Sequence, residues 1–194
     1  MSDTTRAQFL RRGAKGGLAL VAGGSVLGLA QGTAFGAGTA DPDIAKLAAT
    51  AELLAIDFYQ RSIASKKLKG DELGYLSSAL GNEQAHYAAL KGVLKSQTPK
   101  GLAFKYPAGA FASRKSIGQL GMALETAFVG AYMGAVKALS SNELKAVAAE
   151  IGACESRHLS VLSNIAANQI VPAPALPKVL TAAQATAAVR PFLA

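Results

Sequence analysis

Both histidines of the chain lie three residues after a glutamate, in Glu83-Gln-Ala-His86 and Glu155-Ser-Arg-His158. On a helix, residues three apart share a face about one turn apart, so each carboxylate and its imidazole can reach the same ion. A single Glu-x-x-His is more often a surface feature than a metal site. Two copies that use the only histidines favour metal binding.

Two further glutamates, Glu52 and Glu125, lie in the middle of apolar stretches, as Glu83 and Glu155 do. A charged side chain in an apolar core needs compensation. The spacing repeats, because Glu52 precedes Glu83 by 31 residues and Glu125 precedes Glu155 by 30. Four converging carboxylates repel one another unless they are protonated or neutralised, and two cations would neutralise them. The sequence therefore predicts a site for two metal ions with the ligands Glu52, Glu83, His86, Glu125, Glu155 and His158.

Three other residues near these ligands carry functional groups. Tyr59 and Tyr132 each follow the glutamate of their own stretch by seven residues. Their hydroxyls could donate to glutamate ligands and so support catalysis, or the rings could simply pack in the core. Cys154 directly precedes Glu155, and we expect it to point to another side of the helix as a small buried hydrophobe. Oxygen and imidazole ligands suit iron or manganese, although zinc could occupy the same site.

Four long apolar-periodic stretches must position these residues. We predict helices at 42–66, 71–95, 116–139 and 141–168, with Asp41 capping the first and Pro42 at its first position. The first and last joints are short, which predicts two antiparallel hairpins. A longer stretch at 98–111, rich in Pro and Gly, can run the length of a bundle. The prediction is an all-α four-helix bundle over 38–170 with one long crossover, followed by a Pro-rich extension over 171–194 with a short helix at 181–189.

The order Glu, Glu-x-x-His, Glu, Glu-x-x-His on four successive predicted helices resembles the di-iron carboxylate site of bacterioferritin, rubrerythrin and the ferritin-like superfamily, including its small exported members. The resemblance implies that Glu83 and Glu155 bridge two iron ions. It implies that Glu52 and Glu125 are terminal ligands, and that His86 and His158 each complete one ion. It also implies no haem, because Gln84 stands where bacterioferritin has its haem-binding methionine. Phe128 stands where rubrerythrin has an extra glutamate, and the rubredoxin cysteines are absent, which disfavours a rubrerythrin-type peroxidase with built-in electron transfer.

The same resemblance implies a function. Such a protein would react Fe(II) with oxygen or peroxide, as a ferroxidase or a peroxide scavenger. Two alternatives stay open: a module that binds or sequesters metal without turnover, and a structural bundle with a degenerate site. The sequence does not decide whether the protein is an enzyme, or whether it forms a homodimer or a larger homo-oligomer.

The N-terminal residues 1–37 have the composition of a signal peptide. A basic stretch from Arg6 to Lys15 precedes fifteen largely apolar residues, 16–30, and then small residues. This run is shorter than the about 20 residues of a membrane-spanning helix, so we expect cleavage and no stable membrane anchor. The segment Thr5–Arg11 resembles the twin-arginine export motif except that Ala7 replaces the second arginine. The weakly hydrophobic, glycine-rich core favours the twin-arginine route, and the general secretory route stays open. We expect an exported, periplasmic or otherwise extracytoplasmic bacterial protein.

The overall composition is that of a globular helical protein, with 51% hydrophobic and 16% charged residues. Of the net charge of +8, residues 1–37 carry +3, and the remaining basic residues are dispersed, without the basic stripe and interleaved aromatics of a nucleic-acid interface. A single cysteine excludes an intrachain disulfide and a four-cysteine metal site. We therefore expect metal ions and oxygen or peroxide as partners, and no nucleic acid.

Overall fold

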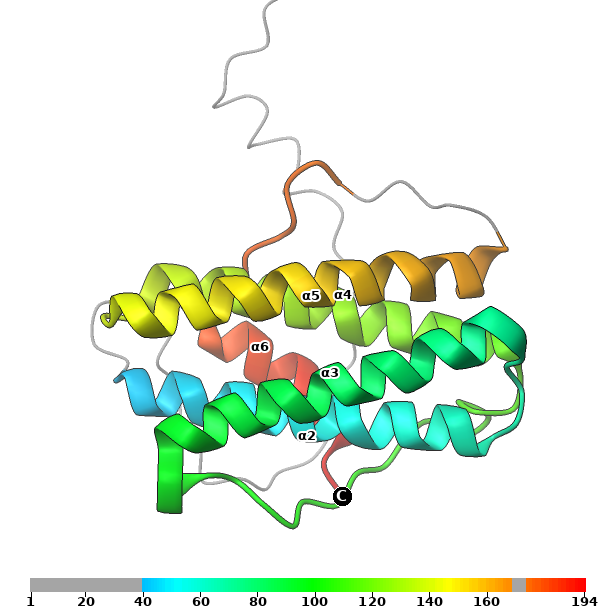
Figure 1. Cartoon of the computed structure of the whole chain (residues 1–194), viewed down its shortest axis with the longest axis horizontal. Helices are drawn as coiled ribbons and strands as arrows, with labels where there is room; N and C mark the ends of the chain where they lie inside the picture. The colour runs from blue at the N-terminus through cyan, green and yellow to red at the C-terminus, as the bar shows by residue number, and fades with distance from the viewer. Residues whose placement is uncertain (1–39, 169–173) are drawn as a thin grey trace, which may run out of the picture.

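Residues 40–168 and 174–194 are described by the computed structural model, and most of them lie in helices (Figure 1). Four long helices follow one another: α2 (Asp41–Ala64), α3 (Gly70–Leu94), α4 (Arg114–Ala138) and α5 (Asn142–Ala167). A short helix, α6 (Ala182–Val189), comes last, and single 3-10 turns follow α3 (Lys95–Gln97) and α6 (Arg190–Phe192). The predicted all-α fold is confirmed. The predicted signal peptide, residues 1–37, lies outside the described residues and stays a prediction.

The long crossover decides how the two hairpins meet. α2 and α3 form one antiparallel hairpin, and α4 and α5 form the other (Figure 1). The chain between α3 and α4 returns along α2 to the far end of the bundle. Arg61 Nη2 donates to Phe104 O and Tyr106 OH donates to Leu54 O, both at 3.4 Å, so this segment is held against α2. α4 therefore runs parallel to α3, as the predicted crossover requires.

Polar clamps fasten the two ends of the bundle. At one end the Asp41 carboxylate accepts from the backbone N–H groups of Ser140 and Ser141, at 2.8 and 2.9 Å. The expectation that Asp41 caps its own helix was wrong, because these two N–H groups at the α4–α5 turn use its oxygens. At the other end Arg114 Nε lies 2.9 Å from Glu72 Oε1, and Arg114 Nη1 donates to Ile165 O at 2.8 Å. The hairpins are thus held in register from both ends.

Glycines on α4 let neighbouring segments approach its backbone. A Cβ at Gly118 would lie 2.4 Å from the backbone nitrogen of Ala166 on α5, far inside any allowed contact. A Cβ at Gly130 would lie 2.5 Å from Lys178 O, and Gly130 O accepts from Leu180 N at 2.9 Å. The first glycine brings α5 close to α4, and the second seats the segment that leads into α6.

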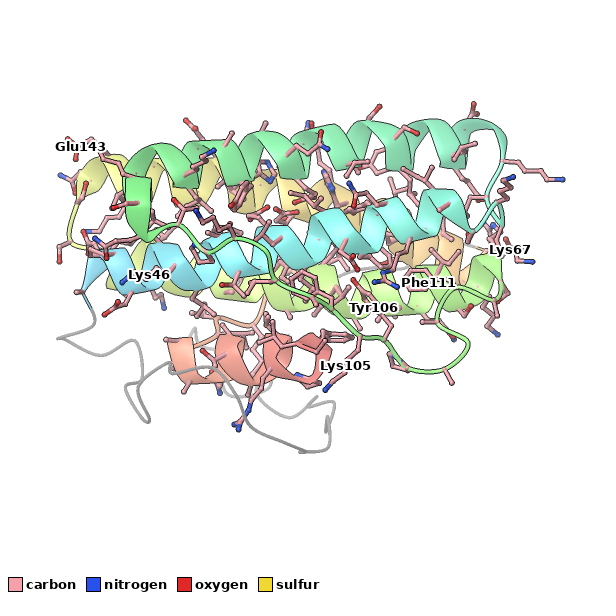
Figure 2. The ribbon with its side chains drawn as sticks, turned by 90° about the horizontal axis from the view of Figure 1, so that it is seen from below. Lys46, Lys67, Lys105, Tyr106, Phe111 and Glu143 are labelled. Carbon is pink, nitrogen blue, oxygen red and sulfur yellow. The ribbon has the colours of Figure 1, made fainter. Side chains whose placement is uncertain are left out.

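The C-terminal segment is part of the packed structure. α6 lies against α2 and α4, on the side of the bundle away from α3 and α5 (Figure 2). Lys105 N donates to Phe192 O at 2.8 Å, and Ala194 N donates to Ala103 O at 3.0 Å, so the chain end pairs with the crossover. Among the residues described, no helix is both long and apolar enough to span a membrane.

Candidate metal centre

Each long helix contributes one glutamate to the middle of the bundle. Glu52 on α2, Glu83 on α3, Glu125 on α4 and Glu155 on α5 each expose between 0% and 2% of their surface. The apolar neighbours one turn away on each helix bury these side chains, because the same face that builds the core carries the carboxylate. Burial at this depth is rare for glutamate. The four predicted carboxylates therefore meet inside the core.

The two histidines complete two overlapping groups of possible metal ligands. One group is Glu52, Glu83, His86 and Glu155, and the other is Glu83, Glu125, Glu155 and His158. Within each group the ligand atoms all lie within 4.8 Å of one another. Glu83 and Glu155 belong to both groups, while each of the other four residues belongs to one. The structure thus brings together all six predicted ligands.

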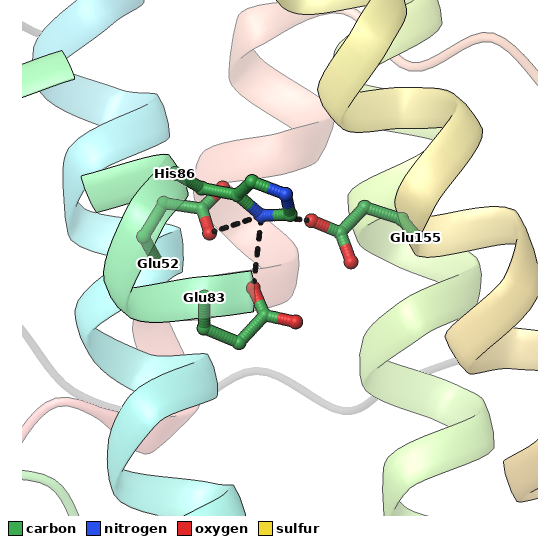
Figure 3. A group of neighbouring side chains, drawn as sticks. All are labelled: Glu52, Glu83, His86 and Glu155. Atoms are coloured by element: carbon green, nitrogen blue, oxygen red, sulfur yellow. Dashed lines mark hydrogen bonds and ion pairs between the residues drawn. The ribbon is translucent and has the colours of Figure 1, made fainter. Parts of the chain in front are cut away.

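His86 is surrounded by three carboxylates, as Figure 3 shows. Its Nδ1 lies 3.4 Å from Glu52 Oε2, 3.4 Å from Glu83 Oε2 and 3.2 Å from Glu155 Oε1. Burial acts to lower the pKa of His86, but the three nearby carboxylates outweigh it, so the pKa rises above its ordinary value. In the metal-free protein this imidazolium supplies part of the charge that the carboxylates need.

His158 has different surroundings. Its Nδ1 lies 3.2 Å from Glu83 Oε1, on the side of the carboxylates, while its Nε2 faces away from them. Burial, with the nearby charges of His86 and Arg157, lowers the pKa of His158 to about 4, so the ring is neutral at pH 7. A neutral imidazole is the form that binds a metal.

Tyr59 and Tyr132 form a reciprocal pair of hydrogen bonds across the bundle. Tyr59 on α2 donates to Glu125 Oε1 on α4 at 2.6 Å, and Tyr132 on α4 donates to Glu52 Oε1 on α2. Each tyrosine therefore reaches the glutamate of the other hairpin. Both rings are buried, with 0% and 3% exposure. Burial raises the pKa of both phenols well above the ordinary value, so both stay protonated as donors.

Several carboxylate oxygens have no hydrogen-bond partner among the described residues. They are Glu52 Oε2, Glu83 Oε1, Glu125 Oε2, Glu155 Oε1 and Glu155 Oε2. Histidine nitrogens approach some of these oxygens without the direction of a hydrogen bond. A buried oxygen without a partner costs free energy, and every one of the four glutamates has at least one. An oxygen-rich set completed by two imidazoles fits two metal cations, so the residues present suit such ions.

Cys154 and Asn82 are contacts of the centre that the sequence analysis missed. Cys154 is buried as expected, but its Sγ lies 3.3 Å from His158 Nε2, a contact that was not expected. Asn82 Nδ2 lies 3.2 Å from the same nitrogen. The i,i+4 spacing of Cys154 and His158 could have revealed the first contact. Because these groups touch the outer nitrogen of the ring, they fix its orientation.

Comparison with known proteins agrees with this geometry. A model of the ferritin-like domain matches residues 40–168, which are 129 of the 194 residues. The match covers all four long helices and all six candidate ligands. No curated protein matches the chain in sequence.

The metal-free protein should lose stability as pH rises from 7 to 9. Burial raises the pKa of Glu83 from 4.5 to about 10 and raises that of Glu155 as well, and the pKa of His86 lies above its ordinary value. Between pH 7 and 9 the folded chain therefore still holds protons that the unfolded chain has already lost. For each such proton, the free energy of unfolding falls by about 1.4 kcal/mol per pH unit as the pH rises. The lowered pKa of His158 changes the stability only below its ordinary value of 6.5, so it does not contribute between pH 7 and 9.

Denaturant unfolding of the chelator-treated protein at pH 7, 8 and 9 measures this slope. Glu83→Gln removes one titrating group and should flatten it, while Glu150→Gln, an exposed change on the same α5 that carries Glu155, should not. A stability that is constant or rises over this window would show that the buried carboxylates are already ionised.

Proposed function

The chain belongs to the ferritin-like domain family, and from this premise we propose that it binds two iron ions at the candidate metal centre and oxidises Fe(II) with oxygen or peroxide. The observation that carries the proposal is the set of five buried carboxylate oxygens that find no hydrogen-bond partner within residues 40–168 and 174–194. A structural bundle would gain nothing from burying them. Manganese or zinc could bind the same residues.

The two overlapping groups support a division of roles. Glu83 and Glu155, which both groups contain, would bridge the two ions. Glu52 and His86 would complete one ion, and Glu125 and His158 the other. The four carboxylates would then neutralise a total charge of plus four, which is the charge of two divalent ions.

The bound ions would supply electrons, because two Fe(II) ions give up two electrons, which with two protons reduce dioxygen to hydrogen peroxide or hydrogen peroxide to water. The residues of the chain prepare the site for this. The glutamates with raised pKa release protons when cations bind. Tyr59 donates to one oxygen of Glu125 and Tyr132 to one oxygen of Glu52, and these hydrogen bonds orient the two carboxylates. The apolar core around them limits the access of water.

Fe(II) titration without oxygen, followed by admission of oxygen or peroxide, tests the function. Uptake of two ions per chain and consumption of the oxidant are expected. Tight uptake with no consumption would instead indicate a sequestering module, and no uptake a structural bundle.

Substitution of the shared carboxylates should affect both ions. Glu83→Gln or Glu155→Gln keeps the shape of the side chain but removes its charge, so we expect iron content to fall from about two ions per chain to below about one. Glu52→Gln or Glu125→Gln should lose only the ion of its own group. Elemental analysis after anaerobic loading and desalting measures this, with Glu150→Gln as the matched exposed control. Two tightly held ions in both Glu83→Gln and Glu155→Gln would contradict the bridging roles.

The tyrosines should affect the rate and leave the ion count unchanged. Tyr59→Phe frees Glu125 and Tyr132→Phe frees Glu52, and the loss of such a hydrogen bond to a ligand typically costs about 10- to 100-fold in affinity or activity. We expect slower iron oxidation with two ions still bound. Tyr106→Phe is the matched control, because its hydroxyl contacts Leu54 O on α2 instead of a ligand. Unchanged kinetics in the Tyr59→Phe, Tyr132→Phe double variant would leave both rings with a packing role alone.

We also propose that the protein is exported, with residues 1–37 as the cleaved signal. The support is the basic, then apolar, then small-residue order of this segment. N-terminal sequencing of protein recovered from outside the cytoplasm should begin near residue 38. A mature protein that still starts at Met1 would contradict it.

A further inference from the structure

A small cavity lies between α2, α4 and α6, with a volume of about 20 Å³. Helix α2 contributes Ala48 and Ala51 to its wall, α4 contributes Phe128, Ala131 and Tyr132, and α6 contributes Val189 and Ala185. The α6 side is the outer wall of the cavity, since α6 covers α2 and α4 (Figure 2). The C-terminal segment therefore covers a partly open apolar space beside the metal centre.

The lining of the cavity selects what can occupy it. All the lining residues are apolar or aromatic, and the one hydroxyl among them, that of Tyr132, is already donated to Glu52. A buried water needs two to four polar partners and a space of roughly 10–15 Å³, so the cavity has the room for one small molecule but lacks the partners for water. Hydrogen peroxide, with two hydroxyl groups, is excluded for the same reason. A small apolar molecule fits.

The cavity is adjacent to the candidate metal centre. Tyr132 belongs to both, because its ring lines the cavity while its hydroxyl bonds Glu52. Ala51 directly precedes Glu52, and Phe128 lies one helical turn after Glu125. One layer of side chains, which includes Tyr132, Ala51 and Phe128, thus lies between an apolar molecule in the cavity and the carboxylates.

From this position and chemistry we infer that the cavity is a binding site for dioxygen, which makes dioxygen the oxidant that this centre receives. This inference rests on the proposed iron oxidation and adds to it the choice between oxygen and peroxide. The same space would hold dioxygen whether or not metal is bound, since no ligand lines it.

Xenon, an apolar atom that occupies dry cavities, tests the site directly. A crystal of the full metal-free chain under xenon pressure should show one xenon atom between α2, α4 and α6. Ala185→Val adds two methyl groups to the wall on α6, far in sequence from every candidate ligand, and should remove the xenon. Val189→Ala enlarges the space and should keep it. Ala187→Val makes the same change as Ala185→Val on the exposed face of α6 and should leave the xenon in place.

Comparing the rates of iron oxidation by oxygen and by peroxide tests whether the cavity takes part in turnover. In Ala185→Val the KM for oxygen should rise severalfold with iron content unchanged, while oxidation by peroxide should keep the rate of the parent protein. No xenon in this cavity of the parent protein, or an unchanged KM for oxygen in a folded Ala185→Val that has lost xenon, would overturn the inference. Iron content measured on the same samples separates the two claims, because absence of iron binding refutes the metal centre and leaves the xenon result to stand alone.

Discussion

The burial of four carboxylates in one apolar core is the constraint on which this structure depends. Each ionised glutamate would cost several kcal/mol in such surroundings without compensation. The chain supplies some compensation itself, through the imidazolium of His86, the hydroxyls of Tyr59 and Tyr132, and raised carboxyl pKa values. Five oxygens still have no hydrogen-bond partner among the described residues. The remaining deficit is the physical reason to propose cations there.

The rest of the bundle keeps these groups at fixed positions. Asp41 holds the start of α2 to the α4–α5 turn, and Arg114 joins the start of α4 to α3 and α5 at the other end. Gly118 allows α5 to approach α4 closely. With both ends fixed and the helices in close contact, the mid-helix carboxylates cannot move apart to relieve their repulsion. The clamps thus hold together a set of acidic groups with raised pKa values, and metal binding would release their protons.

The sequence predicted the helices and the convergence of six side chains because both follow from periodicity. Spacing of three residues sets which groups share a helix face, and the repeated 30- and 31-residue intervals match the two hairpins. What it missed depends on how helices pack. The tyrosines bond glutamates of the opposite hairpin, Asp41 caps a turn about 100 residues away, and Cys154 contacts His158. The cavity under α6 could not be predicted, since it exists only where side chains of three helices leave space.

The two halves of the centre are alike in sequence but differ in their surroundings. His86 exposes 13% of its side chain, whereas His158 exposes 1% and is backed by Cys154 and Asn82. The cavity lies on the side of Tyr132, whose hydroxyl bonds Glu52, and Glu52 belongs to the group of His86. Solvent and the apolar cavity therefore approach the same ligand group. If two ions bind, the one held by Glu52 and His86 would be the more accessible to solution, and the ion of Glu125 and His158 would be the more enclosed by protein.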